Sequence, residues 1–209
     1  MTGYFVTGTD TNVGKTVLSA LLVAALDGNY WKPVQTGAIE GTDRESVRAW
    51  TEAGEERLPS ERYRFDPVVS PHLASREAGI RISLDAFDLP AAPPGRRWII
   101  EGAGGAMVPL NERDVMRDLM RRIGFPVLIA ARTALGTINH TLLTLAALRD
   151  VRLPICGVAL LGEENIENRR AIEHYGEVPV VGRIPILKKI DRTALLDAYE
   201  KHFDHRKFE

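Results

Sequence analysis

The sequence has very little cysteine and no long apolar run, and each absence excludes a class of protein. A single cysteine, Cys156, cannot form an internal disulfide, so nothing indicates an oxidising compartment. No stretch reaches the roughly 18 consecutive apolar residues that a membrane-spanning helix needs. The N-terminus also lacks the basic region and apolar core of a signal peptide. We therefore expect a cytoplasmic protein with no membrane segment.

Neither sign of charge is in excess. The chain carries 27 lysines and arginines against 28 aspartates and glutamates, and it has no long basic run. Proteins that bind nucleic acids need clustered basic groups to displace counterions from the phosphates, so we expect no nucleic-acid partner. At 209 residues with 44% apolar content, the chain is typical of one globular domain, which we place at residues 1–209.

Short apolar runs alternate with amphipathic stretches along the chain. Strands that are apolar throughout, each followed by a helix, are typical of a parallel sheet covered by helices on both faces. The sequence therefore predicts an α/β fold, mostly parallel and resembling P-loop NTPases. We expect strands at residues 4–7, 30–34, 98–101, 126–130, 155–160 and 178–181, helices at 15–26, 43–53 and 137–148, and a loop at 89–94.

A glycine-containing loop separates the first strand from the first helix. It runs from Gly8 to Thr16 with the sequence GTDTNVGKT. Backbone N–H groups and a helix N-terminus in this context surround phosphates, while Lys15 supplies a cation and the Thr16 hydroxyl a ligand for Mg²⁺. Thr9 occupies the first glycine position of G-x-x-x-x-G-K-[ST], so the motif departs from its simplest form. The alternative is a generic turn, but strand, Gly-Lys-Thr and helix coincide, which predicts a loop for ATP and Mg²⁺.

Charged side chains follow other predicted strands. Ligands in open α/β sheets bind beyond the carboxyl ends of the strands. Glu101 is placed there as a Mg²⁺ ligand, or it is an ordinary loop carboxylate. Lys32 is a candidate cation for a transferred phosphate, with the Thr36 hydroxyl as a further donor, or it is a surface lysine. Asp43 either completes the metal site with Thr16 and Glu101 or is an ordinary acidic residue at the N-terminus of a helix.

The predicted helix at residues 137–148 offers a second anion site. Its N-terminus at Gly136 and Thr137 could hold the carboxylate of an organic substrate. His140 lies in its first turn, and an ordinary packed histidine is the simplest interpretation of that residue. The sequence contains no Cys/His cluster with zinc spacing and no G-x-S-x-G turn.

Five stretches together resemble the dethiobiotin synthetase family of biotin biosynthesis. They are residues 5–16, 32–37, 70–72, 101–105 and 135–140, in this order across most of the chain. The resemblance implies a reaction in which ATP, CO₂ (or bicarbonate) and 7,8-diaminopelargonate give dethiobiotin, ADP and phosphate. One amine becomes a carbamate, the carbamate attacks the γ-phosphate, and the other amine closes the ureido ring. It also implies a homodimer.

The resemblance carries over residue by residue. The implied catalytic residues are Lys15, Lys32 and Thr11, and the implied metal ligands are Thr16, Asp43 and Glu101. The implied nucleotide-binding residues are Asn12, Val13, Gly14, Lys15, Thr16, Val17 and Pro185. The implied substrate-binding residues are Thr36, Gly136, Thr137, Ile138 and Asn139, the last four binding the substrate carboxylate across the dimer interface.

One position departs from the family pattern. Many relatives carry an Asn-Asp pair after the fifth strand that reads adenine, whereas this chain has Leu161 and Gly162. Neither residue offers a side-chain hydrogen bond to a base, so we expect other nucleotides to be accepted. Residues 163–165, or backbone groups near Pro185, are the remaining candidates for base recognition.

Three other classes share a similar loop. An amidating synthase of the cobyrinate type needs a nucleophilic cysteine, whereas Cys156 lies in an apolar strand. A partitioning-type NTPase switch carries an early lysine where this chain has Asp10. A simple P-loop kinase needs an arginine-rich lid, and neither Arg121-Arg122 nor Arg169-Arg170 lies in such a loop. A requirement of ATP turnover for a diamino acid and bicarbonate would separate the synthetase from all three.

Overall fold

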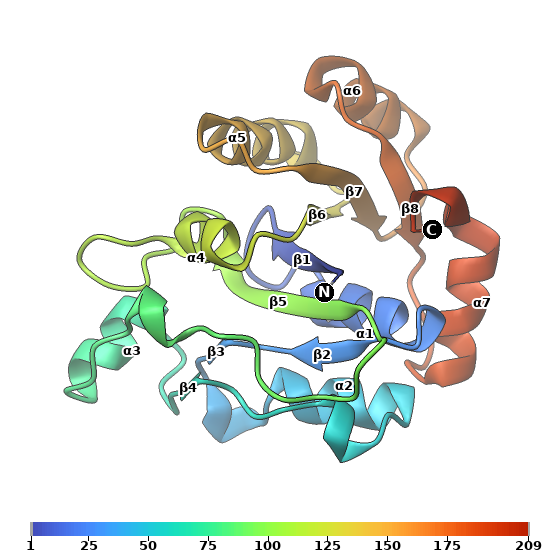
Figure 1. The fold of residues 1–209 in the computed structure, drawn as a ribbon. Helices are drawn as coiled ribbons and strands as arrows, with labels where there is room; N and C mark the ends of the chain where they lie inside the picture. The colour runs from blue at the N-terminus through green and yellow to red at the C-terminus, as the bar shows by residue number, and fades with distance from the viewer. Residues whose placement is uncertain (1, 209) are drawn as a thin grey trace.

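A central sheet of six parallel strands organises the molecule (Figure 1). The structure is a computed structural model and describes residues 2–208. The strand order is β2-β5-β1-β6-β7-β8, and every pairing in this sheet is parallel, which confirms the predicted α/β class. The strands are β1 (Gly3–Gly8), β2 (Asn29–Trp31), β5 (Trp98–Gly105), β6 (Val127–Arg132), β7 (Ile155–Leu161) and β8 (Val180–Ile184).

Helices cover both faces of this sheet (Figure 1). One face carries α1 (Lys15–Ala25), α2 (Asp43–Thr51) and α7 (Arg192–His202). The other carries α3 (Pro71–Glu77), α4 (Met116–Ile123), α5 (Thr137–Asp150) and α6 (Ile166–Gly176). Short 3₁₀ turns lie at Ala38–Glu40, Glu55–Arg57, Leu84–Ala86 and His205–Lys207. Among residues 2–208, no helix combines the length and apolar character needed to cross a membrane.

Burial on both faces explains why the strands are apolar throughout. Phe5 and Val6 are neighbours on β1, are both fully buried, and belong to the hydrophobic clusters on opposite faces. Successive side chains of a strand alternate between faces, so a strand with two covered faces needs apolar residues at every position. A buried polar side chain within a strand then needs a partner, as Glu101 on β5 has.

Two predicted strands differ from those observed. The segment 30–34 splits, because β2 ends at Trp31 and Val34–Gln35 (β3) pairs instead with Tyr63–Arg64 (β4) in a separate two-stranded sheet. Pro33, which has no N–H to donate, stands at the break. In contrast, β5 does not stop at residue 101 but continues through its glycines, and Gly105 pairs with Gly8 of β1.

Candidate active site

The phosphate loop joins β1 to α1. Gly14 precedes the first residue of α1 with φ of 92°, a left-handed conformation that favours glycine. A Cβ at this position would also lie 2.4 Å from a methyl group of Leu161, which would have to move. No side chain of the described residues caps the N-terminus of α1. The first-turn N–H groups of the helix are therefore available to phosphate oxygens.

Asp10 organises the tip of this loop. Its carbonyl oxygen accepts from Lys15 Nζ at 3.1 Å, and its Oδ1 accepts from the Thr11 N–H at 2.7 Å. Its Oδ2 lies 2.9 Å from Arg132 Nη2 at the end of β6. Burial lowers the pKa of Lys15, and the nearby carboxylate of Glu101 opposes that shift. The Lys15 side chain thus folds back onto its own loop, where it contacts the Asp10 carbonyl and lies near the Glu101 carboxylate.

Three oxygen-bearing side chains converge at the start of α1. Thr16 Oγ1 lies 2.8 Å from Asp43 Oδ1 and 3.0 Å from Glu101 Oε1. Asp43 is the first residue of α2, whose N-terminus is fixed by a reciprocal capping box between Thr42 and Glu45. Glu101 is fully buried on β5, which excludes the solvated loop carboxylate considered from the sequence. These two acids and the hydroxyl come from three separate segments.

Lys32 lies between the two carboxylates. Its ammonium is 3.1 Å from Glu101 Oε1 and forms an ion pair with Asp43. The residue is only 5% exposed, so it is not a surface lysine. Burial alone would lower the pKa of Lys32, but the charges of Glu101 and Asp43 raise it overall. Burial likewise opposes ionisation of Asp43, yet Lys32 and Thr16 hold the pKa of Asp43 below its usual value.

Sequence reasoning missed two residues that support this cluster. The Tyr30 hydroxyl donates to Glu101 Oε2 at 3.0 Å, and the Gln35 side-chain oxygen accepts from the Asp43 N–H at 3.1 Å. The signal for Tyr30 was its position two residues before Lys32, because residues at a spacing of two share one face of a strand. Gln35 lies in the stretch that supports the family resemblance, but no pattern in the sequence links its side chain to the start of α2.

The donor set fits Mg²⁺. This ion prefers oxygen ligands, binds proteins through one or two carboxylates, and keeps phosphate oxygens and water as its other ligands. Thr16, Asp43 and Glu101 supply one hydroxyl and two carboxylates next to the phosphate loop. Within residues 2–208, no group of three or more His, Cys, Asp or Glu side chains could hold a metal alone. The cluster therefore suits a metal ion whose remaining ligands come from a nucleotide.

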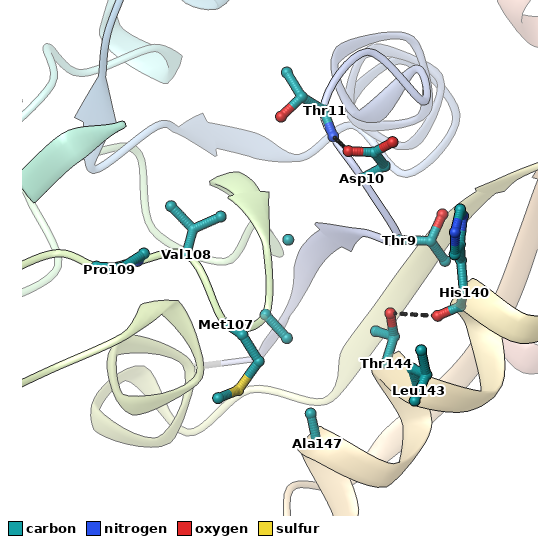
Figure 2. A pocket seen from close by; sticks show the side chains of 12 residues that line it. Thr9, Asp10, Thr11, Met107, Val108, Pro109, His140, Leu143, Thr144 and Ala147 are labelled. Atoms are coloured by element: carbon teal, nitrogen blue, oxygen red, sulfur yellow. Dashed lines mark hydrogen bonds between the residues drawn. The ribbon is translucent and has the colours of Figure 1, made fainter. Parts of the chain in front are cut away.

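A cavity of about 410 Å³ opens beside the loop (Figure 2). Thr9, Asp10 and Thr11 form one wall, residues 105–109 a second, and side chains of α5 a third. His140 is exposed and lines this cavity, so it is not the packed histidine that we expected. Neither Thr36 nor residues 136–139 line it. Those predicted substrate residues do not meet the phosphate loop at this cavity.

A second cavity, of about 280 Å³, lies on the other side of the loop. Five predicted nucleotide-binding residues line it, namely Asn12, Val13, Gly14, Val17 and Pro185. The rest of its wall is mostly apolar, with Leu161, Ile184, Ile186, Leu187 and Ile190, apart from Arg132 and Gly162. Residues 163–165 are absent from this lining, and the Asn165 side chain accepts from the Asn168 N–H as the cap of α6. That use of Asn165 leaves the pocket without a side-chain amide from this loop.

Cys156 does not have the surroundings of a nucleophile. It lies on β7, where burial raises the pKa of its thiol, and its Sγ contacts the Lys207 carbonyl at 3.8 Å. A reactive cysteine needs a lowered thiol pKa. The structure thus gives no support to an amidating enzyme that uses this residue.

The fold and the site define this chain as a P-loop nucleotide-binding protein. A family model described as an AAA domain matches residues 2–194. The chain is 45% identical over 203 residues to the ATP-dependent dethiobiotin synthetase BioD of Rhodopseudomonas palustris (strain BisB18), covering 97% of this chain and 96% of that protein. It is 47% identical over 195 residues to the enzyme of that name from Paramagnetospirillum magneticum, covering 93% of each. The chain belongs to the dethiobiotin synthetase family.

A solved structure shows the same fold at low identity. The ParA family ATPase from Chlorobium tepidum TLS superposes with a TM-score of 0.53 and 13% identity, over 96% of this chain and 93% of that one. At this identity the likeness concerns the fold alone. It agrees with the parallel sheet and phosphate loop described above.

The apolar second cavity predicts weak selection between bases. GTP and CTP should support turnover within about tenfold of ATP, a gap of about 1.4 kcal/mol. A site rejects a wrong base strongly only when buried polar groups are left unpaired, and Leu161 has none to leave. Rates should be measured with ATP, GTP and CTP at one Mg²⁺ concentration. A preference for ATP of a hundredfold or more would show that backbone groups near Pro185 or the loop at 163–165 read the base.

Proposed function

We propose that this chain is an ATP-dependent dethiobiotin synthetase that acts on 7,8-diaminopelargonate and CO₂. The observation that carries the proposal is the cluster of Lys32, Asp43 and Glu101 around Thr16, directly beside the phosphate loop, in which Lys32 and Glu101 are buried. Curated relatives with this activity in their names are 43–47% identical over nearly the whole chain. The reaction gives dethiobiotin, ADP and phosphate.

The chemistry needs cations more than a covalent nucleophile. One substrate amine attacks CO₂ and loses a proton, which gives a carbamate. A carbamate oxygen then attacks the γ-phosphorus of ATP, and the bond from that phosphorus to ADP breaks. The second amine attacks the carbonyl carbon of this carbamic-phosphoric anhydride, closes the ring and expels phosphate. Phosphoryl transfer depends mainly on positioning and on stabilising charge, which Lys15 and Lys32 are placed to supply.

Mg²⁺ belongs to this proposal. Thr16, Asp43 and Glu101 would hold it, and it would neutralise charge on the β- and γ-phosphate oxygens. The raised pKa of Lys32 keeps its ammonium charged at neutral pH, beside the same two carboxylates. We place Lys32 and Thr36 on the carbamate and the transferring phosphate, and we assign Thr11 to the catalytic set.

The substrate chain has a suitable place in the first cavity. Its wall combines polar groups of the phosphate loop with the apolar side chains of Val108, Leu143 and Ala147. That pattern suits a molecule with reactive amines at one part and a hydrocarbon chain at the other. The N-terminus of α5, residues 136–139, would bind the substrate carboxylate of a partner protomer. That arrangement requires a homodimer, which is part of this proposal.

The proposed activity has a direct test. ADP release should require both 7,8-diaminopelargonate and bicarbonate, and dethiobiotin should appear in equal amount by mass spectrometry. Lys15→Ala should abolish turnover because the phosphates lose their loop cation, while the melting temperature stays near that of the wild type. ATP hydrolysis that ignores the diamine would contradict the proposed function. Near-normal turnover by Lys15→Ala would contradict the role of the loop.

Lys32→Ala should affect the chemical step more than nucleotide binding. Removing a cation that acts where charge develops costs about 10²–10³ in kcat. Loss of Lys32 also leaves the buried Glu101 and the half-buried Asp43 without their cation. Lys32→Met, which keeps the bulk of the side chain, and thermal melts should therefore accompany it. Steady-state kinetics and nucleotide titrations separate the effects. A collapse of nucleotide affinity at constant kcat would make Lys32 a ground-state binding residue instead.

Glu101→Gln and Asp43→Asn should each raise the Mg²⁺ concentration needed for half-maximal activity. We expect a rise of at least about tenfold, since even the outer partners of a metal site often contribute that much. Glu45→Gln is the matched control, because Glu45 belongs to the capping box of α2 and not to the cluster. An unchanged Mg²⁺ requirement in either variant would remove that residue from the metal site.

A further inference from the structure

A tyrosine hydroxyl contacts the acidic cluster from inside the protein. Tyr30 is fully buried, and its hydroxyl donates to Glu101 Oε2 at 3.0 Å. The pairing of β2 with β5 sets Tyr30 opposite Ile99, two residues before Glu101 on the same face. The phenol ring therefore extends along the face of the sheet toward the site.

The two oxygens of Glu101 have different partners. Oε1 is near the Thr16 hydroxyl at 3.0 Å and the Lys32 ammonium at 3.1 Å, which are both part of the proposed machinery. Oε2 accepts from Tyr30. The carboxylate is fully buried, so a lost donor would not be replaced by bulk water.

We propose that Tyr30 is a positioning residue that fixes the rotation of the Glu101 carboxylate and so aims Oε1 at the metal site. The inference rests on the metal site of the proposed function. Without the phenol hydroxyl, Oε2 would compete for Thr16 and Lys32, and Oε1 would no longer have one orientation. Groups that hold a metal-binding carboxylate by hydrogen bonds typically affect metal affinity by 10–100-fold.

The environment of Tyr30 keeps it a donor. Burial and the charge of Glu101 raise the pKa of the phenol well above its usual value. A tyrosine hydroxyl ordinarily titrates only at about pH 10, so it is protonated and can donate in an assay near neutral pH. Since the ring packs in the hydrophobic cluster beneath α1, Tyr30→Phe removes the hydrogen bond and keeps the packing.

Tyr4 provides a matched control. It lies on β1 and pairs with Ile99 from the opposite side, so Tyr4 and Tyr30 flank one residue of β5. The Tyr4 ring meets Phe208 edge to face, with 5.6 Å between the ring centroids. Phe208 is far in sequence from the residues of the acidic cluster. Tyr4→Phe thus makes the same chemical change in the same sheet.

The test measures metal binding directly, using Mn²⁺ in place of Mg²⁺. Electron paramagnetic resonance of Mn²⁺ with the ADP-bound protein gives the affinity without any turnover. Tyr30→Phe should weaken Mn²⁺ binding by about tenfold. Metal-free ADP affinity should change little, and Tyr4→Phe should match the wild type in both affinities. The melting temperature of Tyr30→Phe should fall by several degrees, because a buried carboxylate oxygen loses its donor. The double variant with Glu101→Gln should lose no more than Glu101→Gln alone, because coupled residues are not additive.

The outcomes separate this inference from the proposed function. Unchanged Mn²⁺ affinity in Tyr30→Phe, with a loss in Glu101→Gln, overturns the role of Tyr30 and leaves the metal site standing. Unchanged affinity in both overturns the metal site and the inference together. An additive loss in the double variant, or an equal loss in Tyr4→Phe, shows that Tyr30 does not act through Glu101.

Discussion

The ion pairs of Lys32 with Glu101 and Asp43 are the contact on which the site depends. Removing a charge from water costs several kcal/mol, and an unpaired buried charge is strongly destabilising. Lys32 is 5% exposed and Glu101 fully buried, so each needs the other in place. The pairing also joins three elements, since the lysine follows β2, Glu101 lies on β5, and Asp43 begins α2.

The parallel sheet explains why these groups meet. All strands of the main sheet run in one direction, so their carboxyl ends share an edge, and β1 delivers the phosphate loop there between β5 and β6. The continuation of β5 beyond Glu101 contributes to the same arrangement. The paired glycines Gly8 and Gly105 bring the loop and the end of β5 close together, and a Cβ at Gly105 would lie 3.2 Å from the Gly8 carbonyl.

The sequence predicted most reliably what is encoded in neighbouring residues. The phosphate loop is one contiguous segment between a strand and a helix, and the alternation of apolar runs indicated the sheet. Partners far apart in the chain are harder to assign, and Thr16 and Glu101 are 85 residues apart. The position of Glu101 after a buried strand already indicated a metal ligand beside Thr16, whereas local sequence left Asp43 undecided and the family resemblance assigned it to the site. The bond from Tyr30 depends on the register between β2 and β5, which no local pattern records.

Pro33, in contrast, is a local feature of the sequence that indicates the break in the predicted strand 30–34. A residue without an N–H interrupts a ladder, so 30–34 could not be one central strand. The break has a consequence for the site. Lys32 lies between β2 and β3 instead of in the middle of a strand, and the chain then turns to place Gln35 against the N-terminus of α2.

Leu161 connects the second cavity with the phosphate loop. Its side chain packs against Gly14, where an added Cβ would force the Leu161 methyl to move, and it also lines the apolar cavity. In the proposed function, the residue that offers the base no hydrogen bond would also lie against the backbone that holds the phosphates. The loop N–H groups and Lys15 would act alike on every nucleotide, so most of the binding energy would come from the triphosphate. Discrimination between substrates would then be left to the first cavity, where residues of the phosphate loop face α5.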